Sequence, residues 1–255
     1  MSNSEPEQVV VRKKPSRGIY LLPNLFTTGC LFSGFYAIVS ANAGNFEAAA
    51  AAIFIAMVLD GLDGRVARLT NTASEFGVQY DSLADMVSFG VAPALVMYLW
   101  AFSDMGKLGW VVAFVYTAAT ALRLARFNTQ AEVADKRFFQ GLPSPSAAAV
   151  VAGLIWLGVD YGIEGKDIAV LAMVITLFAG LLMVSNFRYY SFKDIDFKGK
   201  VPFFTLLVAV MVFVFISLDP PQILFGIFML YLVSGLVLTI WGIRQKRTLR
   251  AKEAD

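Results

Sequence analysis

Histidine is absent from this 255-residue chain, and cysteine occurs only once. Without histidine, the side chain most often used for proton transfer near neutral pH, a general base has to be Asp, Glu, Lys or Tyr. The lone Cys30 excludes an intrachain disulfide and a metal site built from several cysteines. Charged residues are also scarce, at 16% against 58% hydrophobic residues, whereas soluble domains carry about 25% charged residues. This composition indicates an integral membrane protein.

Eight apolar stretches have about the length that a membrane helix needs, roughly 20 residues. They are 19–41, 46–67, 81–102, 108–126, 147–163, 167–185, 201–218 and 222–243. The sequence therefore predicts an all-α polytopic bundle of about eight transmembrane helices. The stretch 147–163 is short and rich in small residues, which leaves a shallow or re-entrant element open there. We expect a polar arm at 1–18, one membrane-embedded domain at 19–243 and a basic tail at 244–255.

Basic residues fall almost entirely on one side of this predicted bundle. If the N-terminus lies inside, every lysine and arginine except Lys107 and Lys166 belongs to an inside segment. Because cytoplasmic loops carry such an excess of Lys and Arg, we expect both termini in the cytoplasm. The outside loops are short and nearly uncharged, so the functional site is expected at the cytoplasmic end of the bundle.

Four aspartates gather at the cytoplasmic ends of the second and third predicted helices. They are Asp60, Asp63, Asp81 and Asp85. On α-helices the first pair shares a face with two small residues and an arginine, and the second pair forms one stripe with a glycine. These neighbours are Gly64, Ala67, Arg68 and Gly77. Because the two helices are antiparallel neighbours, the four carboxylates are expected to converge at one membrane depth.

Carboxylates held this close repel one another unless some are protonated or cations lie between them. Oxygen ligands without His or Cys suit Mg²⁺, Mn²⁺ or Ca²⁺, and four carboxylates can hold two ions about 3.5–4 Å apart. Such ions polarise phosphoryl oxygens, and Arg68 adds a bidentate phosphate donor. Solvated helix caps, with arginines that pair with them or contact lipid phosphates, are the alternative. That alternative explains single residues but not the phased set.

The segment from Asp60 to Asp85 resembles the CDP-alcohol phosphotransferases. It matches every position of their pattern D-x-x-D-G-x-x-A-R-x₈-G-x₃-D-x₃-D. The resemblance implies that a CDP-linked lipid and an alcohol form a phosphodiester while CMP leaves, with two divalent cations, Mg²⁺ or Mn²⁺, as cofactors. It implies that the metal ligands are Asp60, Asp63 and Asp81. The nucleotide-binding residues would be Gly64, Ala67, Arg68 and Gly77. Asp85 would be the base and is also a further candidate ligand.

The family pattern leaves the acceptor alcohol open, and other residues bear on it. "ALRLARFNTQ" (121–130) places Arg123 and Arg126 on one helical face at the cytoplasmic end of the fourth span. Two guanidiniums there can bind a carboxylate or a phosphate, or they can snorkel to lipid headgroups. Arg188 is a weaker acceptor candidate. Asn24 and Thr27, at the start of the first span, are candidates for contact with the nucleotide.

Three stretches are similar to the phosphatidylserine synthase branch of the family. They are "LPNLFTTGCLFSGF", "ALRLARFN" and "GLPSPSAAA". The similarity implies L-serine as acceptor, CDP-diacylglycerol as donor, membrane lipids as partners, no nucleic acid, a homodimer and a prokaryotic cell membrane. The choice of Mg²⁺ or Mn²⁺ and of an ester or ether donor stays open. Within "GLPSPSAAA", we expect Ser144 and Ser146 to cap the following helix, with an orientation toward the site as the alternative.

Two rival functions fit parts of this sequence. With glycerol 3-phosphate as the acceptor, Arg123 and Arg126 would hold its phosphate. A cation-coupled or proton-coupled transporter also carries carboxylates in the membrane. A transporter predicts acidic residues spread through the membrane depth, whereas the aspartates here gather at one end.

Overall fold

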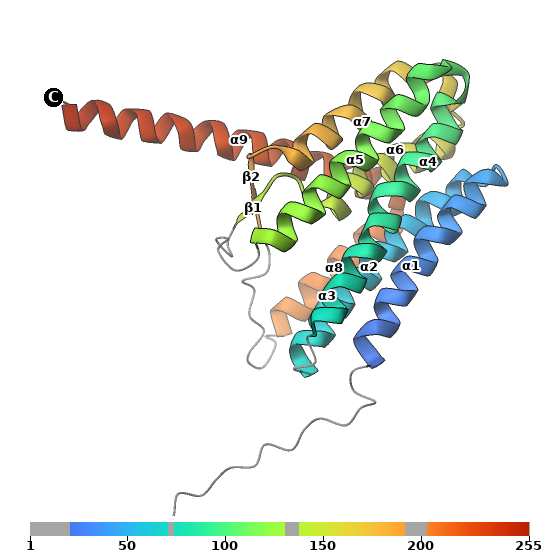
Figure 1. Ribbon diagram of the computed structural model, residues 1–255, viewed down its shortest axis with the longest axis horizontal. Coiled ribbons are helices and arrows are strands. Elements are labelled where there is room, and N and C mark those ends of the chain that lie inside the picture. Colours follow the sequence, from blue (N-terminus) through green and yellow to red (C-terminus); the bar gives the residue numbers. More distant parts are fainter. Residues whose placement is uncertain (1–20, 71–73, 131–137, 192–202, 255) are drawn as a thin grey trace, which may run out of the picture.

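The computed structural model describes residues 21–70, 74–130, 138–191 and 203–254, and it is an all-α bundle (Figure 1). Within the described residues, helices cover most of each of the eight predicted apolar stretches. The α-helices in the described ranges are α1 (Leu21–Asn42), α2 (Phe46–Thr70), α3 (Glu75–Asp85), α4 (Ala92–Met97), α5 (Lys107–Gln130), α6 (Ser144–Asp160), α7 (Ala169–Val184), α8 (Phe203–Leu218) and α9 (Pro220–Ala254). Among the described residues, 5 helical segments are long and apolar enough to cross a membrane.

The third predicted span is a continuous run of helical turns that changes type along its length. α3 passes into a π-helical turn, η2 (Met86–Val91), then into α4, a second π-helical turn η3 (Tyr98–Phe102) and a 3₁₀ turn η4 (Ser103–Met105). Pro93, in the first turn of α4, has no N–H to donate to the Phe89 carbonyl. The Tyr116 hydroxyl donates to that carbonyl instead, at 3.2 Å. A side chain of α5 thus replaces the backbone hydrogen bond that is lost at Pro93.

Helix α6 packs against α2, α4, α7 and α9 and is largely buried. Its first half carries small residues, which let neighbouring helix backbones approach closely. At Gly153, a Cβ atom would lie 3.2 Å from the backbone of Phe225 on α9. The small residues of 147–163 therefore allow close helix packing. The segment is one unbroken helix from Ser144 to Asp160.

A short antiparallel pairing joins two loops at the end of the bundle. β1 (Phe138–Gln140) pairs with β2 (Arg188–Tyr190), a contact that no pattern in the sequence predicts. Tyr189 is buried, and its hydroxyl donates to the Leu232 carbonyl of α9 at 3.1 Å. Burial raises the pKa of Tyr189 to about 12, so the hydroxyl keeps the proton that it donates.

Helices α8 and α9 expose large apolar side chains. Phe213, Leu218 and Leu230 are each more than 70% exposed, at 72%, 75% and 74%. Continuous apolar exposure of this kind is typical of helices that face lipid rather than water. α9 continues past residue 243, the expected end of the membrane domain, to Ala254, and Figure 1 shows its last turns running beyond the bundle. The predicted arm at 1–18 lies outside the described residues.

Candidate metal and nucleotide site

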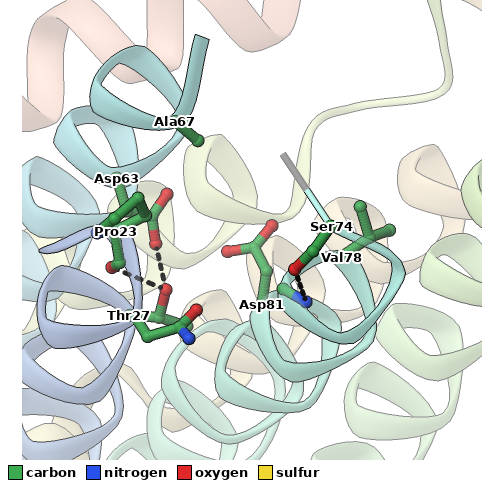
Figure 2. A pocket seen from close by; sticks show the side chains of 10 residues that line it. Pro23, Thr27, Asp63, Ala67, Ser74, Val78 and Asp81 are labelled. Atoms are coloured by element: carbon green, nitrogen blue, oxygen red, sulfur yellow. Dashed lines mark hydrogen bonds between the residues drawn. The ribbon is translucent and has the colours of Figure 1, made fainter. Parts of the chain in front are cut away.

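A cavity of about 130 Å³ lies where α1, α2 and α3 meet, and Figure 2 shows the side chains around it. It is lined by Pro23, Asn24, Thr27, Asp63, Gly64, Ala67, Ser74, Gly77, Val78 and Asp81. This set includes all the predicted nucleotide-binding residues except Arg68. The cavity therefore unites the start of the first span with both halves of the aspartate motif.

Three of the four aspartates form a compact cluster. Carboxylate oxygens of Asp60, Asp63 and Asp81 all lie within 4.8 Å of one another. Asp63 is buried and the other two are half-buried. Figure 2 shows Asp63 on α2 and Asp81 on α3 pointing into the space between their helices. Oxygen ligands on opposite sides of one cation lie at most about 4.2 Å apart for Mg²⁺ and about 5.2 Å apart for Ca²⁺. Carboxylates within 4.8 Å of one another are thus close to the spacing at which they can share a divalent cation.

Local contacts hold both aspartate pairs in register. The Thr27 hydroxyl of α1 donates to Asp63 Oδ2 at 2.9 Å in a buried setting. On the other side of the cavity, Ser74 Oγ accepts a hydrogen bond from Gly77 N at 3.0 Å and caps α3. Because this N-cap starts the helix at Glu75, Gly77 and the aspartates that follow at four-residue intervals lie on one continuous helical stripe, as the sequence predicts.

Asp85 lies next to the cluster but outside the three-carboxylate set. It is half-buried, its side chain is hydrogen-bonded to that of Asp60, and its charge interacts with Asp60, Asp81 and Arg123. Its Oδ1 atom is fully buried and has no hydrogen-bond partner within the described part of the chain. Because buried polar atoms are nearly always hydrogen-bonded, this oxygen is available to a ligand or to a proton.

Arg123 on α5 is only 8% exposed. Its Nη1 donates to Ser144 Oγ at 2.8 Å, and its charge interacts with Asp85 and Asp60. Its Nε atom is buried and has no hydrogen-bond partner among the described residues. This burial beside carboxylates does not fit a snorkelling arginine, whose head would lie in the headgroup region.

The other three predicted arginines make contacts elsewhere in the described structure. Arg68 is exposed, and its Nε donates to the Gly64 carbonyl one turn back on α2 at 2.8 Å. Arg126 donates from Nη1 to the Ser185 carbonyl at 3.3 Å and to Asn186 Oδ1 at 3.4 Å. Arg188 is exposed at the start of β2. The geometry thus separates Arg123 from the other acceptor candidates.

One expectation about this region is wrong, and several lining residues were not anticipated. Ser144 does not cap α6: the N-cap residue is Pro143, without a side-chain cap bond, and the Ser144 hydroxyl faces Arg123 instead. Ser74 is not among the predicted site residues, although a serine directly before a helical segment is a known N-cap signal. Pro23 and Val78 line the cavity with apolar atoms, and nothing in their residue type marks that role.

Comparisons with known proteins agree on one family. The sequence profile described as CDP-alcohol phosphatidyltransferase matches residues 20–182. A Helicobacter pylori protein named CDP-diacylglycerol--serine O-phosphatidyltransferase is 38% identical over 224 residues, which cover 88% of this chain and 92% of the relative. Proteins of the same name from Mycobacterium tuberculosis and Methanocaldococcus jannaschii are 41% identical over 162 residues and 37% identical over 142 residues. These matches cover 60% and 56% of this chain, and 56% and 63% of the respective relatives.

Proposed function

The chain belongs to the CDP-alcohol phosphatidyltransferase family, and from that premise we propose that it transfers a phosphatidyl group from CDP-diacylglycerol to the hydroxyl of L-serine. The products are phosphatidylserine and CMP. The choice of L-serine is supported by the relatives, which are named CDP-diacylglycerol--serine O-phosphatidyltransferase. The buried guanidinium of Arg123, whose charge interacts with Asp85 and Asp60, is compatible with this acceptor. A charged group at that place suits an acceptor with both a hydroxyl and a carboxylate.

The donor's nucleotide and pyrophosphate are assigned to the cavity between α1, α2 and α3. Gly64 supports this assignment, because no atom lies within 4 Å of the place where its Cβ would be. Ala67 and Gly77 also line the cavity, and their small size leaves room for the donor. The lipid tails of the donor extend sideways into the bilayer. The exposed Arg68 can turn from the Gly64 carbonyl to a phosphate oxygen at little cost, since among the described residues its side chain is held by one hydrogen bond.

The aspartates are assigned to divalent cations, and their oxygen chemistry fits Mg²⁺ or Mn²⁺. Asp60, Asp63 and Asp81 would hold an ion together, and Asp85 would complete a two-ion site with them. When bound, the ions polarise the phosphoryl oxygens and stabilise the leaving phosphate. Asp63 would be a metal ligand, and the Thr27 hydroxyl orients its carboxylate through a hydrogen bond.

Asp85 is assigned as the general base. It accepts the proton of the serine hydroxyl, whose oxygen attacks the lipid-side phosphorus. The new phosphorus–oxygen bond forms as the bond between that phosphorus and the CMP oxygen breaks, and CMP leaves with the electron pair. Arg123 holds the serine carboxylate during this step, and Arg126 and Arg188 are secondary candidates for the same anion.

We place the site at the cytoplasmic side of a bundle with eight spans and both termini inside. The distribution of lysine and arginine supports this orientation. The helix ends agree with it, because Asp63 lies near the end of α2, Asp81 in the first third of the span Glu75–Met105 and Arg123 near the end of α5. Antiparallel neighbours bring these ends to the same membrane depth.

The test is CMP release by purified protein in detergent with CDP-diacylglycerol and Mn²⁺ or Mg²⁺. L-serine, glycerol 3-phosphate and no acceptor are compared, with Asp81→Ala as the blank. Release that depends on serine and metal is expected. Asp85→Asn should lower turnover about 10²–10⁴-fold while much of the donor binding persists. Release with glycerol 3-phosphate alone would overturn the acceptor, and a fully active Asp85→Asn would overturn the base.

A further inference from the structure

Arg123 and Ser144 form a buried polar pair at the junction of α5 and α6. Ser144 is 0% exposed and Arg123 is 8% exposed, and Nη1 donates to Oγ at 2.8 Å. A serine hydroxyl satisfies this N–H without cancelling the positive charge, as a carboxylate in its place would do. The guanidinium is therefore fixed at one nitrogen and keeps its charge for another partner.

Two further buried atoms define where that partner belongs. Arg123 Nε is a donor without an acceptor, and Asp85 Oδ1 is an acceptor without a donor, both within the described part of the chain. The two side chains also interact electrostatically. A ligand that offers an anionic acceptor to Nε and a hydroxyl to Oδ1 satisfies both atoms, which neutral alcohols without an anionic group cannot do.

The turn that carries Ser144 is clamped to the end of α7. Gly141 has φ +77°, a left-handed conformation that favours glycine. Its N–H donates to the Phe187 carbonyl at 2.8 Å, and the next N–H, of Leu142, donates to the Leu182 carbonyl at 3.0 Å. The Ser144 hydroxyl therefore stands on a rigid support rather than on a mobile loop.

We propose that Ser144 is a positioning residue that fixes the Arg123 guanidinium for the acceptor's carboxylate and so determines acceptor preference. This inference rests on the proposed function. Ser144 acts through Arg123 and does not itself contact the reacting atoms. Its loss frees Nη1, which lets the guanidinium rotate toward Asp85 and away from the bound carboxylate.

The experiment compares Ser144→Ala with Ser33→Ala, a matched control. Ser33 is also a buried serine, but its hydroxyl donates to the Gly29 carbonyl of its own helix. CMP release is measured in membranes against L-serine, CDP-diacylglycerol and serinamide, a probe in which a neutral amide replaces the carboxylate. Ser144→Ala should raise KM for L-serine about tenfold or more, as expected for a lost hydrogen bond to a charged group. KM for CDP-diacylglycerol should stay unchanged, and the preference for L-serine over serinamide should fall by a similar factor.

A lower kcat with unchanged KM for serine and unchanged preference for serine over serinamide would overturn the proposal, because a purely structural role predicts that result. If Ser144→Ala does not accumulate, Ser144→Cys keeps the side-chain volume with a weaker acceptor and is judged by the same two readouts. In an Arg123→Lys background, Ser144→Ala should add no further rise in KM for serine. A wild-type chain without serine-dependent release would refute the proposed function, whereas an active wild type with Ser144 variants equal to Ser33→Ala would refute this inference alone.

Discussion

Replacing Gly64 by alanine should separate the stability of the fold from the use of the cavity. Gly64 lies inside α2, and its added Cβ would meet no atom within 4 Å. The substitution therefore brings no clash. Because glycine is about 0.8–1.0 kcal/mol less favourable than alanine in a helix interior, the variant should be more stable than the wild type by roughly that amount. For a domain of this size, this corresponds to a rise in Tm of about 2–4 °C.

The same methyl group should impair catalysis, because Gly64 lines the cavity assigned to the donor. A phosphate displaced by about 1 Å from its productive position can cost about 10²-fold in rate. We therefore expect kcat/KM for CDP-diacylglycerol to fall by between about 10-fold and 10²-fold. Gly61→Ala is the matched control, since Gly61 lies one turn earlier on α2, has nothing within 4 Å of its Cβ position and is not among the residues that line the cavity.

Thermal unfolding in detergent and initial rates at subsaturating CDP-diacylglycerol measure the two effects. Both variants should unfold at higher temperature than the wild type, and only Gly64→Ala should lose activity. Equal activity of the two variants would refute the assignment of the cavity to the donor. A destabilised Gly64→Ala would instead show that the space beside Gly64 is filled in the folded protein.

Two further substitutions test separate parts of the structure. Thr27→Val removes the hydrogen bond to Asp63 without changing side-chain shape greatly, and it should raise the Mn²⁺ concentration needed for half-maximal activity about 10–100-fold; an unchanged metal titration would contradict the supporting role of this hydroxyl. Gly235→Ala places a Cβ 2.2 Å from the Tyr189 ring and should destabilise the protein by about 1–3 kcal/mol. Gly226→Ala, on the same helix with nothing within 4 Å of its Cβ position, should not destabilise it, and equal Tm values for these two variants would show that the Tyr189 ring adapts.

The parts of the site that repeat along one helix could be predicted from the sequence. The helical period alone places Gly77 and the two aspartates after it on one stripe, and the short connection makes α2 and α3 neighbours. The link between Arg123 and Ser144 could not be predicted, because it joins helices whose relative rotation depends on packing. Serine before an apolar stretch is also a normal capping signal. Here the Ser144 hydroxyl instead accepts a hydrogen bond from the buried guanidinium of Arg123. The pairing of β1 with β2 joins segments about fifty residues apart, and three-residue strands leave no periodic pattern.

Helix α1 explains why the distance between the two aspartate pairs is well defined, although it carries no predicted metal ligand. At one point it holds α2, through the hydrogen bond from Thr27 to Asp63. Two turns farther along, it touches the helix that carries the second pair. There a Cβ at Gly34 would lie 2.7 Å from the Cα of Ser88, and the Ser88 hydroxyl donates to the Cys30 carbonyl at 3.0 Å. Backbone contact of this kind admits only glycine. Because α1 contacts both partners, movement of one carboxylate pair relative to the other requires breaking a buried hydrogen bond, which preserves the spacing that the proposed cation site needs.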